Sequence, residues 1–127
     1  MKRILFIALL FTLAETASAQ WVQKKKDGSY TVDTSVLCDN VNGYDGPTPV
    51  SITIKNDKIV SVVLLDNQET YKYVRKVEEQ LLPKYVGLSV KDVLKNQPDG
   101  VTGATYSSKA VKKNIAVGLE EYLKNKK

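Results

Sequence analysis

The chain has 127 residues, a formal net charge of +5, one cysteine and no histidine. Without histidine, its own side chains cannot form a Ser-His-Asp or Cys-His nucleophile pair, and a Cys/His zinc site is excluded as well. Redox or group-transfer chemistry would therefore have to come from an imported cofactor. No aromatic residues alternate with the lysine clusters near the two ends, which argues against a nucleic-acid partner.

The first 19 residues have the pattern of a secretory signal peptide. Lys2 and Arg3 precede an apolar stretch over residues 4–14, and the small residues Ala17-Ser18-Ala19 follow as a cleavage site. The apolar stretch is about half the ~20 residues that a membrane-spanning helix needs. We therefore expect cleavage after Ala19, leaving a mature domain of residues 20–127 in the periplasm or outside the cell.

Strand signals fill the first half of the mature chain. Residues 48–55 alternate between apolar and polar, and Asn56-Asp57 then turns the chain into a β-branched run over residues 59–65. This pattern predicts a hairpin with one face that other elements must cover. An earlier turn signal, Lys26-Asp27-Gly28-Ser29, separates two further candidate strands. These cover residues 21–25 and 30–37.

Helix signals fill the second half. Asp66 with Glu69 three residues later forms a capping pair before an apolar repeat at helical spacing, which Pro83 ends. A short helix follows Ser89 and runs through Lys95, and the longest helix extends to the C-terminal lysines. Strands followed by helices predict an α+β fold, with a small antiparallel sheet packed against helices in a single domain.

The run from Asp99 to Ser108 leads into this last helix and is rich in small and hydroxylated residues. The first turn of a helix offers unpaired backbone N–H groups and a positive dipole end, so we expect an anion there. A phosphate-bearing cofactor is the leading candidate. Lys109 either adds charge to this site or is a solvated surface lysine. The hydroxyl groups that could meet the phosphate belong to Thr102, Thr105, Ser107 and Ser108.

Aromatic residues could contact a flat cofactor ring. Tyr44, Tyr71 and Tyr106 are candidates, although each could instead pack in the core. Cys38 is either a buried small hydrophobe or a free thiol that pairs between chains.

Three segments in order resemble the small FMN-binding domain family, which also occurs in flavin-carrying subunits of sodium-pumping quinone reductase and Rnf-type complexes. They are residues 27–31, residues 43–59 and residues 99–108. The last segment fits the family's flavinylation signature at every specified position: Asp, two variable residues, Ser or Thr, Gly, Ala, Thr. The order of the three segments makes the resemblance stronger than this short signature alone.

The resemblance implies that Thr105 accepts FMN in a phosphoester bond, installed outside the cytoplasm by a separate flavin transferase. Asp99 then serves the transferase or its metal, or it is an ordinary turn residue. Glu69-Thr70 matches a Glu-Thr pair of the family and either contacts the flavin or caps a helix. Tyr71-Lys72-Tyr73 stands where the family usually has small residues. The expected cofactor-binding set is Glu69, Thr70, Asp99, Thr102, Gly103, Ala104, Thr105, Tyr106, Ser107 and Ser108.

The expected function is that of an extracytoplasmic electron carrier with covalent FMN and redox partner proteins. One alternative is a protein that binds FMN reversibly, with the phosphate held by N–H groups. The other is a flavin-free adaptor module whose loop only caps a helix. A small reductase would need a substrate pocket that the sequence does not identify.

Overall fold

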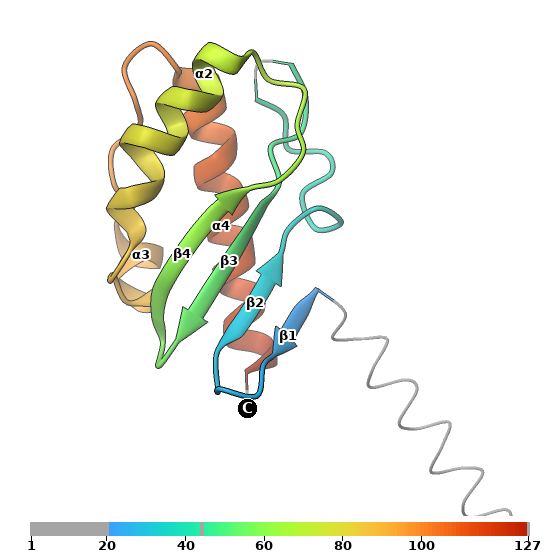
Figure 1. The fold of residues 1–127 in the computed structure, drawn as a ribbon, viewed down its shortest axis with the longest axis vertical. Helices are drawn as coiled ribbons and strands as arrows, with labels where there is room; N and C mark the ends of the chain where they lie inside the picture. Colours follow the sequence, from blue (N-terminus) through green and yellow to red (C-terminus); the bar gives the residue numbers. More distant parts are fainter. Residues whose placement is uncertain (1–20, 44, 127) are drawn as a thin grey trace, which may run out of the picture.

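The computed structural model describes residues 21–43 and 45–126, so that the predicted signal peptide and Tyr44 lie outside the described residues. One antiparallel sheet, in the order β1-β2-β3-β4, is followed by helices, which confirms the predicted α+β fold (Figure 1). The strands are β1 (Val22–Lys24), β2 (Tyr30–Asp33), β3 (Val50–Lys55) and β4 (Lys58–Leu64). The helical segments are α2 (Tyr71–Lys76), the π-helical turn η1 (Val77–Leu81), the 3₁₀ turn η2 (Leu82–Tyr85), α3 (Val90–Lys95) and α4 (Thr105–Asn125). No helix among the described residues is long and apolar enough to cross a membrane.

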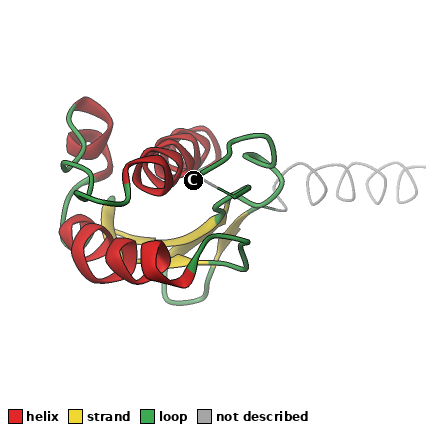
Figure 2. Ribbon diagram, turned by 90° about the horizontal axis from the view of Figure 1, so that it is seen from above, coloured by secondary structure: helices red, strands yellow, loops and turns green. Residues whose placement is uncertain are grey.

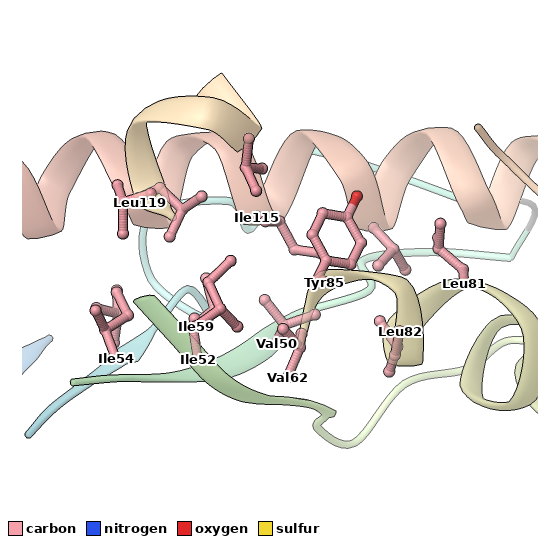
Figure 3. Close-up of a cluster of buried hydrophobic side chains, with 14 of the residues drawn as sticks. Val50, Ile52, Ile54, Ile59, Val62, Leu81, Leu82, Tyr85, Ile115 and Leu119 are labelled. Carbon is pink, nitrogen blue, oxygen red and sulfur yellow. The ribbon is translucent and has the colours of Figure 1, made fainter. Parts of the chain in front are cut away.

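The central hairpin forms as its alternating pattern predicts. β3 and β4 pair in antiparallel register, and the turn residues Asn56 and Asp57 both have positive φ, as a tight hairpin turn requires. Val50, Ile52 and Ile54 are fully buried, whereas the residues between them are partly exposed. The sheet therefore has one apolar face, and Figure 3 shows this face meeting side chains from α4 and η2.

The long helix α4 covers that face, and Figure 2 shows it lying across one side of the sheet. The residues that recur at helical spacing, Val111, Ile115, Leu119 and Tyr122, are all buried. Gly118 lets the helix approach the sheet closely, because a Cβ at this position would lie 2.9 Å from Ile52 Cδ1. At its C-terminal end, the Tyr122 hydroxyl donates to Asp57 at 2.5 Å, which anchors α4 to the β3–β4 turn.

The helical stretch that follows β4 departs from the prediction. α2 begins at Tyr71 and passes into η1 and η2, so helical geometry continues through Pro83, whose missing N–H is harmless at the start of a turn. The predicted capping pair of Asp66 and Glu69 is wrong. Thr70 is the N-cap, and its side chain makes no capping bond. The Glu69 carboxylate accepts hydrogen bonds from α4 and from the loop at residue 45 instead of capping α2.

The strand expected over residues 30–37 is shorter, since β2 ends at Asp33. Thr34 accounts for the early end: its hydroxyl accepts from the Val50 backbone N–H at 2.9 Å and donates to Asn114 Oδ1 at 2.6 Å. The Thr34 N–H still donates to the Val50 carbonyl at 3.0 Å, but the Val50 N–H bonds the Thr34 side chain, so the backbone ladder ends here. Cys38 in the following turn is buried, which confirms the first of its two alternatives, and burial raises the pKa of its thiol.

Candidate functional site

The loop predicted to bind an anion lies at the end of the molecule opposite the C-terminus, directly before α4 (Figure 1). Val101 and Ala104 are buried and anchor the loop to the core, while Thr102, Gly103 and Thr105 are exposed. The predicted helix start is confirmed, because Thr105 is the first residue of α4. The exposed residues therefore stand beside the first-turn N–H groups of a 21-residue helix.

Hydrogen bonds within the loop give it a defined shape. The Val101 backbone N–H donates to Ser108 Oγ at 3.2 Å, and the Ala104 N–H donates to the Val101 carbonyl at 3.1 Å. Gly103 has a φ of +84°, a backbone conformation that residues other than glycine rarely adopt. The hydroxyl of Ser108, which is buried, thus holds the loop back against the first turn of α4.

A side-chain relay supports the chain just before the loop. The Tyr85 hydroxyl donates to Gln97 Oε1 at 2.6 Å, and Gln97 Nε2 donates to the backbone carbonyl of Lys112 at 3.0 Å. The first bond comes from η2 and the second reaches α4, so both layers hold the segment that enters the loop. Burial of the Tyr85 ring raises the pKa of its phenol, which therefore remains a donor at neutral pH.

The carboxylate of Glu69 joins three segments at the site. Ser107 Oγ, in the first turn of α4, donates to Glu69 Oε1 at 2.5 Å, and the Asp45 backbone N–H donates to Oε2 at 2.5 Å. The Glu69 N–H in turn donates to Asn67 Oδ1 at 3.0 Å, and Thr70 Oγ1 donates to Asp45 Oδ2 at 3.3 Å. Glu69 is only 9% exposed, so these bonds satisfy a carboxylate that would otherwise be costly to bury.

Two cavities flank the first turn of α4, and Thr105 lines both of them. The first, of about 260 Å³, has two aromatic walls, Tyr73 and Tyr106. The second, of about 310 Å³, contains the lysines Lys109 and Lys112. Pockets that enclose a drug-sized ligand measure about 300–1,000 Å³, so the first cavity is smaller than this range and the second lies at its lower end. The site is therefore a shallow one, with an aromatic side and a basic side.

The structure also places a cation beside the loop that sequence reasoning missed. The side chain of Lys76, on α2, is partly buried, and its Nζ lies 2.6 Å from the position that a Cβ on Gly103 would occupy. Among the described residues, no carboxylate forms a salt bridge with Lys76. Nothing in the sequence distinguishes Lys76 from Lys72, the exposed lysine of the same helix. For Tyr73, which lines the first cavity, the sequence contains a weak indication, because a tyrosine stands where the family usually has a small residue.

Other predicted residues lie apart from the two cavities. Tyr71 is 72% exposed, and its ring lies 5.7 Å from the Arg75 guanidinium carbon. Asp99 is exposed, and its backbone carbonyl accepts a long bond of 3.5 Å from Lys84 Nζ. The part of the chain that the structure describes contains no group of three or more side chains suited to a metal ion. Glu69 is connected to the site by its hydrogen bond to Ser107, and Thr70 bonds the Asp45 side chain.

Comparison with known protein families identifies this arrangement. The FMN-binding domain model matches residues 43–120, which is more than half of the chain and includes every residue of the expected cofactor-binding set. The chain therefore belongs to the FMN-binding domain family, and FMN is its cofactor. Neither the curated proteins nor the solved structures that were compared give a match.

The residues at the site fit this cofactor. A flavin ring is flat and aromatic, and the tyrosine-walled cavity offers aromatic surfaces of the kind it stacks on. A phosphate is anionic, and the helix start with its neighbouring lysines offers N–H groups and positive charge. FMN supplies the transfer of one or two electrons, which the side chains of this chain cannot supply.

We predict that Glu69→Ala destabilises the protein by about 1–3 kcal/mol, because it leaves the Ser107 hydroxyl and the Asp45 N–H without their acceptor. Denaturant unfolding measures this change, and hydrogen exchange should accelerate first at the Asp45 amide. Glu69→Gln is the matched control and should cost less, since its amide oxygen can accept from the Asp45 N–H while its NH₂ group donates to the Ser107 hydroxyl. A Glu69→Ala protein as stable as the wild type would contradict the role of this carboxylate as a buried hydrogen-bond acceptor.

Proposed function

We propose that Thr105 carries FMN through a phosphoester bond and that the protein transfers electrons outside the cytoplasm. The observation that supports Thr105 is the different placement of the four hydroxyl groups in the loop. Ser107 and Ser108 are buried, and both hydroxyls hold structure together through Glu69 and Val101. Thr102 and Thr105 are exposed, but of the four only Thr105 lines both cavities.

The position of Thr105 suits a group transfer to its oxygen. In the proposed step, Thr105 Oγ attacks the phosphorus of the FMN moiety in a flavin dinucleotide held by a flavin transferase. The phosphorus–oxygen bond to AMP breaks, AMP leaves, and the hydroxyl proton passes to a base of the transferase. The product is a phosphodiester with one negative charge, which the N-terminal end of α4 stabilises.

An electron carrier is favoured over a stand-alone enzyme by the shape of the site. Each cavity is small for a ligand the size of FMN, so the flavin is covered only in part and stays accessible to a redox partner. The predicted signal peptide indicates export, and covalent attachment would keep the cofactor from being lost after export.

The attachment predicts a covalent mass on one peptide. Protein co-expressed with a flavin transferase should gain the mass of FMN less one water on the peptide that contains Thr105, and Thr105→Ala should lose it entirely. Thr105→Ser should retain some attachment, since serine also places a hydroxyl at this position. Intact-protein and peptide mass spectrometry measure all three.

Ser35→Ala is the matched control, because Ser35 carries an exposed hydroxyl outside the signature and outside both cavities, and its loss should leave attachment intact. Acid precipitation separates the alternatives: covalent FMN stays yellow in the pellet, reversible FMN passes into the supernatant, and an adaptor module is colourless in both. Colour in the supernatant alone, with an unmodified Thr105 peptide, would contradict the phosphoester.

Export predicts a defined N-terminus for the mature protein. Protein recovered from the periplasm or the medium should begin at Gln20, the residue that follows the predicted cleavage site. N-terminal sequencing and cell fractionation provide the measurement. Full-length protein that remains in the cytoplasm would refute the proposed location and leave the attachment test unaffected.

Electron transfer predicts reversible bleaching of the flavin. After anaerobic reduction with dithionite, the flavinylated protein should pass electrons to a soluble one-electron acceptor, with about two acceptor molecules reduced per flavin. Absorption spectroscopy follows both partners, and the Thr105→Ala protein serves as the blank. A flavin that stays reduced in the presence of such acceptors would rule out the role of a carrier.

A further inference from the structure

We infer that Lys76 binds the phosphate of FMN at Thr105 and holds it against the loop. The inference rests on the proposed attachment to Thr105, and it deepens that proposal by assigning the phosphate a counterion from a different helix. Its starting point is the position of the Lys76 ammonium beside Gly103, two residues before Thr105.

The Lys76 ammonium lies against the backbone of Gly103. A Cβ on Gly103 would lie only 2.6 Å from Lys76 Nζ, which is closer than any Cβ contact in a real protein. The ammonium therefore occupies the space that a side chain at position 103 would fill. Gly103 serves two purposes here: it adopts the positive φ of the turn, and it leaves room for a cation beside the exposed backbone.

Among the described residues, the charge of Lys76 is not balanced by a salt bridge. A partly buried ammonium loses some of its hydration, and proteins normally compensate for that loss with a carboxylate or another anion. No described residue forms such an ion pair with Lys76, although Arg75 next to it pairs with Glu79 at 2.9 Å. A phosphodiester at Thr105 would supply the missing anion, in a charge-assisted hydrogen bond stronger than a neutral one.

Lys76 differs in position from the two lysines of the second cavity. Lys109 is exposed and lies one helical turn beyond Thr105, so that water screens its charge. Lys112 lies a further turn along α4, in the second cavity. Lys76 approaches from α2, across from the N-terminal end of α4. The phosphate would then lie between a helix dipole on one side and an ammonium group on the other.

The test separates recognition of the phosphate from recognition of the ring. In the Thr105→Ala protein, which cannot form the bond, reversible binding of FMN and of riboflavin is measured by quenching of flavin fluorescence. Adding Lys76→Gln should weaken FMN binding about tenfold, the effect of losing a hydrogen bond to a charged group. Riboflavin has no phosphate, so its affinity should not change.

The matched variants are Lys72→Gln and Lys76→Arg. Lys72 is an exposed lysine one turn earlier on the same helix, so its loss should leave both affinities unchanged. Arginine at position 76 keeps the charge and should restore most of the preference for FMN. In protein that keeps Thr105, Lys76→Gln should also slow FMN attachment about tenfold when the transferase is limiting. Circular dichroism checks that each variant is folded.

The outcomes distinguish this inference from the proposed attachment. If Lys76→Gln accepts FMN at the wild-type rate and binds it with unchanged affinity, or if it loses riboflavin equally, the inference is wrong while the attachment stands. If Thr105 carries no flavin but Lys76 still separates FMN from riboflavin, the attachment is wrong and the phosphate contact is supported. Where reversible binding is too weak to measure, the attachment rate decides alone.

Discussion

The carboxylate of Glu69 accepts hydrogen bonds from two segments that lie far from each other in the sequence, the first turn of α4 and the loop at Asp45. Burying an isolated carboxylate would cost several kcal/mol, so the native arrangement depends on keeping both donors in place. Glu69 also directly precedes Thr70, the N-cap of α2. This side chain therefore ties the start of α2 to the first turn of α4, and so helps to hold Lys76 beside Gly103.

The sheet and α4 form the rigid base on which this contact acts. The helix is ~30 Å long at 1.5 Å per residue, and its buried side chains pack along the apolar face of β2 and β3. Each large aliphatic side chain that is fully buried there contributes about 1.5–3 kcal/mol. At the far end, Tyr122 and Lys126 bind Asp57 and lower the pKa of its carboxyl. A helix held at both ends presents its first turn, and hence Thr105, in one orientation.

Local patterns carried most of the fold and only part of the site. The alternation in β3, the Asn56-Asp57 turn and the helical spacing of α4 depend on neighbours within a few residues, which is why the sequence predicted them. The role of Glu69 depends on a partner 38 residues away, and the position of Lys76 depends on a loop 27 residues away. Neighbouring residues predicted a capping role for Glu69, because a capping pair is a short-range interaction, whereas in the structure the carboxylate bonds Ser107 and the Asp45 N–H.

The four hydroxyl groups of the loop show why the structure narrows what the sequence left open. A small-residue loop before a helix indicates an anion, but it treats Thr102, Thr105, Ser107 and Ser108 alike. Helical geometry separates them: Ser107 and Ser108 lie two and three residues beyond the helix start, where the side chains turn inward to Glu69 and Val101. Thr105 remains outside, at the junction of an aromatic and a basic cavity. The buried serines shape the loop, and that shape leaves the threonine oxygen exposed to a transferase.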